Sequence, residues 1–262
     1  MPSTMRAAVI HTPGGPEVLK LEDLPIPEPK RGQVLIRVKA CGLNRSELFT
    51  RQGHSPGVSF PRVLGIEACG LVESCPGDEF KKGQIVATAM GGLGRVMNGG
   101  YAEYTCVPVG NVVPIQTELD WEIPGAVPEM LQTAYGSLMT SLKLQKGDRL
   151  LIRGGTTSIG LAAAAIAKNH GAIVAGTTRK EGRDELLKGS GCEFVIIDKG
   201  TVNEGLRRIW PEGADKVLEL VGATSLVDSL ACVKRGGICC MTGMVGNKWW
   251  ASFPYNRVLS WC

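Results

Sequence analysis

Short stretches of alternating apolar and polar residues, separated by glycine and proline, fill the first half of the chain. Residues 33–40 (QVLIRVKA) are the clearest of these stretches, and a period of two residues is typical of a half-buried strand. Further strands are expected at residues 6–10, 18–21, 70–73, 84–88 and 101–107. Many short strands between turn residues predict a compact, barrel-like β domain.

From about Trp121 the pattern changes to strands that alternate with helices. A helix is expected at 126–142, strands at 149–152, 173–177, 194–198, 216–220 and 238–241, and further helices at 161–168, 183–188 and 225–232. This alternation predicts a doubly wound parallel sheet, and hence an α/β domain. Five strands are expected, whereas a complete dinucleotide-binding fold has about six, so the sheet is predicted to be incomplete at its C-terminal side.

A glycine-rich turn, residues 154–160 (GGTTSIG), joins the strand at 149–152 to the helix that follows it. Such a turn exposes backbone N–H groups at a helix N-terminus, where they attract a pyrophosphate. Thr157 stands where the middle glycine of G-x-G-x-x-G is usual, so either its hydroxyl donates to a phosphate or the turn binds nothing. The βαβ context favours dinucleotide binding. The expected contacts in the turn are Gly155, Thr157, Ser158, Ile159 and Gly160.

The residues after the next strand indicate which dinucleotide is bound. NAD sites place an acidic residue there to bond the ribose hydroxyls, but this chain has Thr178, Arg179 and, a little later, Arg183. Arginine pairs well with a 2′-phosphate, so NADP(H) is predicted as the cofactor. The alternative is a solvated basic turn without a ligand. Later strand ends at the same sheet edge add Val221, Gly243 and Met244 as expected cofactor contacts.

Composition excludes several classes of protein. The net charge of +4 in 262 residues is mild and spread along the chain, so no nucleic acid partner is expected. No apolar run is long enough to span a membrane, and the N-terminus lacks the apolar segment of a signal peptide. The nine cysteines form no C-x-x-C pair, which favours free thiols in a reducing compartment such as the cytoplasm.

Four sequence stretches together resemble the medium-chain dehydrogenase/reductase superfamily, and most closely its zinc-free quinone oxidoreductase group, which uses NADPH. They are residues 40–47 (ACGLNRSE), 64–72 (LGIEACGLV) and 99–104 (GGYAEY), with the turn through Gly160. The resemblance implies a GroES-like β-barrel domain over residues 1–120 and a Rossmann domain over residues 121–248. Residues 249–262 fit neither pattern and are expected to form an atypical tail.

The resemblance also implies which residues face the chemistry. Asn44, Ile66 and Glu129 occupy the positions at which zinc-dependent relatives hold their catalytic metal, and this set cannot bind zinc, so no metal is expected. Asn44 matches a residue beside the nicotinamide ribose, Ser46 a proton-relaying hydroxyl and Thr133 a threonine near the nicotinamide. Alternatively, Asn44 and Ser46 cap a helix, and Thr133 bonds its own helix carbonyl.

The predicted activity is hydride transfer from NADPH to a small molecule, either a quinone or an α,β-unsaturated carbonyl compound, without zinc. Asn44, Ser46 and Thr133 are the expected catalytic residues. One alternative is an enoyl reductase that acts in trans in a biosynthetic pathway. Another is a catalytically inactive, C-terminally truncated form that binds a cofactor or partner. The missing last strand makes a homodimer doubtful.

Overall fold

The computed structural model describes residues 3–246 and residue 248. The chain divides into two compact units, the first comprising Met1–Glu129 and the second beginning at Met130. None of the helices in the part of the chain that the structure describes is long and apolar enough to cross a membrane.

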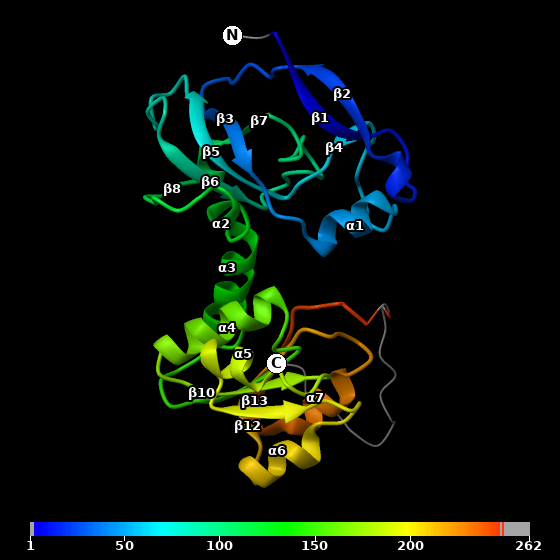
Figure 1. The fold of residues 1–262 in the computed structure, drawn as a ribbon, viewed down its shortest axis with the longest axis vertical. Coiled ribbons are helices and arrows are strands. Elements are labelled where there is room, and N and C mark those ends of the chain that lie inside the picture. Colours follow the sequence, from blue (N-terminus) through cyan, green and yellow to red (C-terminus); the bar gives the residue numbers. More distant parts are fainter. Residues whose placement is uncertain (1–2, 247, 249–262) are drawn as a thin grey trace. The chain divides into compact units, whose positions relative to one another are not determined.

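The first unit consists of two antiparallel sheets with short helices between their strands (Figure 1). One sheet has the order β2-β1-β4 and the other the order β7-β3-β5-β6-β8. Their strands are β1 (Thr4–Ile10), β2 (Lys20–Pro25), β3 (Gln33–Ala40), β4 (Arg62–Val63), β5 (Glu67–Ser74), β6 (Ile85–Ala89), β7 (Tyr104–Pro108) and β8 (Val112–Pro114). The helical segments are two 3-10 turns (Pro16–Val18 and Val109–Asn111), α1 (Arg45–Arg51) and α2 (Glu122–Gly125).

Alternation in the sequence accounts for the core of this unit. Val34 and Ile36 of β3 are fully buried, and they pack with Val72, Val86 and Val107 from the neighbouring strands. Each strand contributes its inward-facing residues at a spacing of two, as the pattern of the sequence predicts. The expected curled β domain is confirmed, and β3 has the predicted bounds.

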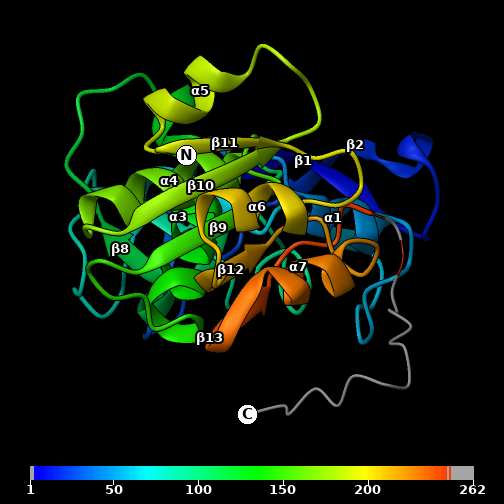
Figure 2. The same cartoon turned by 90° about the horizontal axis from the view of Figure 1, so that it is seen from below.

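The second unit is a five-stranded sheet in which every neighbouring pair is parallel. Figure 2 shows the order β11-β10-β9-β12-β13. The strands are β9 (Arg149–Arg153), β10 (Ile173–Thr178), β11 (Phe194–Ile197), β12 (Ala214–Glu219) and β13 (Val233–Met241). The helices are α3 (Pro128–Tyr135), a π-helix (Gly136–Ser141), α4 (Ser158–Asn169), α5 (Asp184–Gly189), α6 (Asn203–Ile209) and α7 (Leu226–Cys232). The doubly wound fold is therefore confirmed.

Two hydrophobic clusters cover the two faces of this parallel sheet. On one face the small residues Ala163, Ala164 and Ala167 of α4 lie fully buried against the strands. On the other, Leu206 of α6 and Trp210 pack with residues of β12 and α7. The alanines let α4 approach the sheet closely, so the turn that precedes α4 is fixed at the sheet's carboxyl edge.

Some elements differ from the predicted pattern. The predicted helix at 126–142 is divided into α3 and a π-helix, and a 3-10 turn replaces the start of the predicted strand at 18–21. β7 begins at Tyr104 rather than at residue 101. The short strands β4 and β8 and the helix α6 were not predicted. Each contains only one buried residue, so none of them shows a repeating apolar pattern in the sequence.

The start of β12 carries an ion-paired carboxylate that connects three strands. Asp215 Oδ2 accepts from the backbone N of Arg149 at 2.8 Å and from its Nε at 2.9 Å, and Asp215 Oδ1 pairs with Lys234 Nζ. Burial raises the pKa of Asp215, but the hydrogen bonds and charges of Arg149 and Lys234 outweigh this effect and hold the pKa well below its usual range. These contacts link β9, β12 and β13 at their amino ends.

We expect Asp215→Asn to lower the free energy of unfolding by about 2 kcal/mol at pH 7. Because the pKa of Asp215 is lower in the folded chain than in the unfolded chain, this stabilisation is present above the ordinary value of 3.8 and is lost as the pH falls below it. Urea unfolding of both proteins at several pH values measures the difference. A difference that stayed constant between pH 7 and pH 3 would contradict the prediction.

Candidate cofactor-binding site

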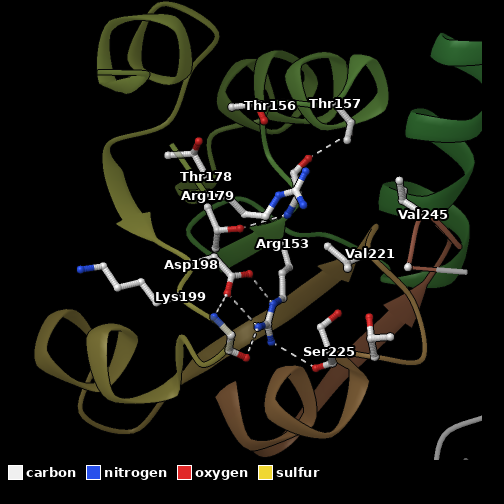
Figure 3. Close-up of a pocket in the computed structure, with 15 residues that line it drawn as sticks. Arg153, Thr156, Thr157, Thr178, Arg179, Asp198, Lys199, Val221, Ser225 and Val245 are labelled. Atoms are coloured by element: carbon white, nitrogen blue, oxygen red, sulfur yellow. Dashed lines mark hydrogen bonds and ion pairs between the residues drawn. The ribbon is translucent and has the colours of Figure 1, made fainter. Parts of the chain in front are cut away.

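A cavity of about 440 Å³ lies in the second unit where the carboxyl ends of β9, β10, β11 and β12 meet (Figure 3). Ligands of doubly wound folds bind at this edge, because the strand ends open there into loops. The cavity is lined by Arg153, Gly154, Thr156, Thr157, Thr177, Thr178, Arg179, Asp198, Lys199, Gly200, Val221, Thr224, Ser225, Val245 and Gly246.

The glycine-rich turn packs tightly against the start of α4. Gly154 has a φ of +84°, a conformation that side chains disfavour. A Cβ atom on Gly160 would lie 2.7 Å from the carbonyl oxygens of both Gly154 and Gly155. Only glycine at position 160 lets the first turn of α4 rest on the loop, and this leaves the helix N-terminus directed at the cavity.

Thr157 begins α4 as its N-cap. Its Oγ1 accepts from the backbone N of Gly160 at 3.0 Å and donates to the carbonyl of Gly154 at 2.9 Å. The hydroxyl proton is therefore used within the turn rather than offered to a phosphate. Threonine thus replaces the usual middle glycine without loss of the turn, because it satisfies one of the N–H groups that a helix start leaves unpaired.

The end of β10 presents a positive charge to the cavity and no carboxylate. Thr178 is buried, and its hydroxyl bonds the backbone of Lys180. Arg179 is exposed, lines the cavity and makes no hydrogen bond or ion pair with other described residues (Figure 3). Arg183 precedes α5, is exposed and does not line the cavity. Of the two arginines predicted to bind a 2′-phosphate, Arg179 is therefore the one that lines the cavity.

Arg153, at the end of β9, is a buried arginine at the floor of the cavity. Its side chain is 1% exposed and forms ion pairs with Asp198 and Asp228. Its Nη1 also donates to the carbonyl of Ser225 at 3.1 Å and to Oγ of Ser229 at 3.2 Å. Burial alone would lower the pKa of Arg153, but the two aspartates and Glu219 raise it instead, so the guanidinium stays charged.

Glu219, the last residue of β12, is fully buried and holds the loop that follows it. Its Oε1 accepts from the backbone N of Val221 at 2.6 Å, from the N of Gly222 at 2.9 Å and from Oγ of Ser225 at 3.1 Å. Its Oε2 accepts from the hydroxyl of Ser229. One carboxylate thus fixes the loop between β12 and α7, which forms one wall of the cavity.

The predicted cofactor contacts divide into two groups. Thr157, Thr178, Arg179 and Val221 line the cavity. Gly155, Ser158, Ile159, Gly160, Arg183, Gly243 and Met244 lie at or near the same edge but are not among its lining residues. Two of these have packing roles, since a Cβ on Gly155 would meet Leu187 and one on Gly243 would meet the carbonyl of Leu220.

Sequence reasoning missed other lining residues, above all Arg153, Asp198, Lys199 and Ser225. Arg153, Asp198 and Lys199 lie at or just after strand ends at the same sheet edge, so their positions were a usable signal, whereas Ser225 is the N-cap of α7. The pairing of Arg153 with Asp198 was not visible, because 45 residues separate them in sequence.

In the first unit, Asn44 and Ser46 lie at the start of α1. Asn44 is the N-cap and forms a capping box with Glu47, which confirms the capping alternative for Asn44. Asn44 Nδ2 also donates to Glu67 Oε1 at 2.7 Å, and the Asn44 side chain is hydrogen-bonded to the carboxyl group of Glu47 as well. Ser46 lies within α1, and its hydroxyl makes no hydrogen bond with other described residues.

Two buried carboxyl groups, those of Glu47 and Glu67, accept hydrogen bonds from Asn44 and also from backbone N–H groups. Glu47 Oε1 accepts from the backbone N of Ile66 at 2.9 Å, and Glu67 Oε2 accepts from that of Glu129 at 2.8 Å. Burial raises the pKa of both carboxyl groups. Thr133, the third predicted catalytic residue, lies in α3 and is half-buried in the second unit.

The zinc-equivalent positions do not make a metal site. Asn44 is bonded to Glu67 rather than free to coordinate, and Ile66 has no donor atom. Among the residues described by the structure, no group of three or more His, Cys, Asp or Glu side chains is placed to hold a metal ion.

Two family models match the chain, an alcohol dehydrogenase GroES-like domain over residues 30–117 and a zinc-binding dehydrogenase over residues 158–259. The quinone oxidoreductase of Pongo abelii is 32% identical over 249 residues, which cover 93% of this chain and 74% of that protein. The chain belongs to the quinone oxidoreductase family. This family is part of the medium-chain dehydrogenase/reductase superfamily, so the predicted resemblance is confirmed.

Solved structures that are similar to this chain have the same two-part fold. The crystal structure of AibC has a TM-score of 0.88 and 28% identity, covering 96% of this chain and 78% of that one. A mycobacterial protein, Rv1454c, was solved in complex with NADPH; its TM-score is 0.83 and its identity 28%, covering 95% of this chain and 76% of that one. The family is thus one of oxidoreductases with a GroES-like domain and a Rossmann-like sheet.

Proposed function

We propose that this chain is an NADPH-dependent oxidoreductase that acts without zinc on a quinone or an α,β-unsaturated carbonyl compound. The cavity at the carboxyl edge of the parallel sheet carries the proposal. It combines the N-terminus of α4 with Arg179, and the end of β10 has no carboxylate. A helix start and an arginine fit the two kinds of phosphate in NADPH.

Residues of the second unit would hold the dinucleotide. The backbone N–H groups at the start of α4, including those of Ser158 and Ile159, would face the pyrophosphate. Arg179, with Arg183 as a second cation, would pair with the 2′-phosphate. Gly155 and Gly160 allow the backbone to approach the phosphates, whereas Val221, Gly243, Met244 and Thr133 would contact the nicotinamide half.

Bound NADPH would supply a hydride to the acceptor. The chain's own contribution is to hold the acceptor and donate hydrogen bonds to its carbonyl oxygen, where negative charge develops. The amide of Asn44 would be one donor, and the hydroxyl of Ser46 would be a second. The hydroxyl of Thr133 would supply a third donor. These donors replace the polarising effect that a metal provides in zinc-dependent enzymes.

We also propose where the chain acts and what kind of acceptor it uses. All eight cysteines in the described part of the chain are free, which supports a reducing compartment, and we place the activity in the cytoplasm. The quinone oxidoreductase relatives support a small-molecule acceptor.

Fluorescence titration of the purified chain with NADPH and, separately, with NADH tests cofactor binding. The proposal expects tighter binding of NADPH. Oxidation of NADPH in the presence of a small para-quinone, and then of a small enone, tests turnover. Binding without turnover of either acceptor would instead support an inactive cofactor-binding form, and binding of neither nucleotide would contradict the proposal.

A further inference from the structure

A carboxylate lies at the cavity although the proposed ligand carries a 2′-phosphate. Asp198 follows β11, the neighbour of β10 in the sheet, and lines the same cavity as Arg179. NAD(H) sites place their acidic residue at the end of the strand that β10 corresponds to, and a carboxylate one strand further along, in the same cavity, would also repel a 2′-phosphate. An Asp198 carboxylate without a partner would therefore weaken the binding of NADPH, the cofactor that Arg179 favours.

The structure shows that the Asp198 carboxylate has partners for both of its oxygens. Arg153 pairs with both carboxylate oxygens, from Nε to Oδ2 at 2.9 Å and from Nη2 to Oδ1 at 3.2 Å. The backbone N of Gly200 donates to Oδ1 at 2.9 Å as well. The Asp198 side chain is only 10% exposed and that of Arg153 only 1%. A two-point pair of this kind is among the strongest charge-assisted contacts in proteins.

Arg153 is itself held in place from other directions. Its Nη2 donates to the carbonyl of Gly200 at 2.9 Å, so the arginine bonds the 198–200 segment through both side chain and backbone. On the opposite side its Nη1 pairs with Asp228 at 2.7 Å. The guanidinium therefore has a fixed position that does not depend on a bound nucleotide.

We propose that Arg153 influences cofactor preference by pairing with Asp198 and fixing its carboxylate against the floor of the cavity. Arg153 thus acts as a positioning residue, since it works through Asp198 and the 198–200 segment. The inference rests on the proposed nicotinamide site. It adds that the NADPH preference depends on a buried arginine that holds the nearby carboxylate, besides the exposed Arg179 that attracts the 2′-phosphate.

Arg153→Gln tests this role through the ratio of the dissociation constants for NADPH and NADH, measured by fluorescence titration. Uncovering the carboxylate should weaken NADPH relative to NADH by about tenfold, because like charges in a shared site repel strongly. The double variant Arg153→Gln/Asp198→Asn should restore the original ratio. An unchanged ratio in folded Arg153→Gln would overturn the inference and leave the proposed function standing.

Two further variants keep the test decisive if Arg153→Gln does not fold. Asp198→Asn alone should change the ratio by less than about threefold, because the charge it removes is already neutralised. A tenfold gain for NADPH together with weaker NADH binding would show an open carboxylate and overturn the inference. Asp228→Asn is the matched control, since it breaks the other ion pair of Arg153 outside the cavity lining and should lower stability without changing the ratio.

Failure of the proposed function gives a different result. If the unaltered chain binds neither nucleotide, the proposed function and this inference both fall. If it binds NADPH and NADH with a ratio that no variant changes, only the inference falls.

Discussion

Arg179→Ala is expected to weaken NADPH binding by about 10- to 100-fold, because the variant loses a charge-assisted pair with the 2′-phosphate. NADH lacks that phosphate, so its dissociation constant should change by less than about twofold. Arg179 makes no hydrogen bond or ion pair with other described residues, and the fold does not depend on it. Fluorescence titration with each nucleotide measures both effects.

Lys180→Ala is the matched control for Arg179. It removes the same charge from the adjacent exposed position, which does not line the cavity, and should leave the affinity for NADPH nearly unchanged. Arg183→Ala then shows how much the second predicted cation contributes. Equal losses for NADPH and NADH in Arg179→Ala would argue that the residue does not contact the 2′-phosphate.

Glu219→Ala is expected to lower the free energy of unfolding by about 3–5 kcal/mol, since removing one partner of a buried charged network leaves the others unpaired. The backbone N–H groups of Val221 and Gly222 would lose their acceptor, as would the hydroxyls of Ser225 and Ser229. Because the loop after β12 lines the cavity, affinity for both nucleotides should fall together. Urea unfolding monitored by tryptophan fluorescence measures the loss of stability.

Glu219→Gln separates the acceptor role of this side chain from its charge. Its amide oxygen can still accept from Val221 and Gly222, so a loss of only about 1–2 kcal/mol is expected. Glu212→Ala serves as the surface control, because the Glu212 side chain is 82% exposed and its contact with Arg149 is 3.8 Å long. A loss below about 1 kcal/mol in Glu219→Ala would contradict the anchoring role of the carboxylate.

Much of the fold could be predicted because the hydrophobic pattern directly reflects burial. The strand β3 and the alanine-rich helix α4 each present a regular buried face, and both lie where the pattern places them. The helix α6 was missed because Leu206 is its only buried residue and Gly205 lowers its helix propensity. The π-helix after α3 has no sequence signal comparable to a proline or a cap.

The site was predictable where one segment carries the chemistry by itself. The turn around Thr157 and the basic residue Arg179 follow their strands directly, and both line the cavity. Arg153 also ends a strand, but its ion pairs could not be predicted, because its partners lie 45 and 75 residues away and only the strand order brings them together. The roles of Asn44, Ser46 and Thr133 remain predictions.

Because Arg179 is exposed and Arg153 is buried, salt should affect their contributions to cofactor selectivity differently. Mobile ions screen exposed charges over a Debye length of about 10 Å at 0.1 M salt, whereas buried pairs are screened much less. Rising ionic strength should therefore weaken the attraction of Arg179 for the 2′-phosphate and leave the ion pair of Asp198 with Arg153 intact. The chain would become less selective in concentrated salt without acquiring a preference for NADH.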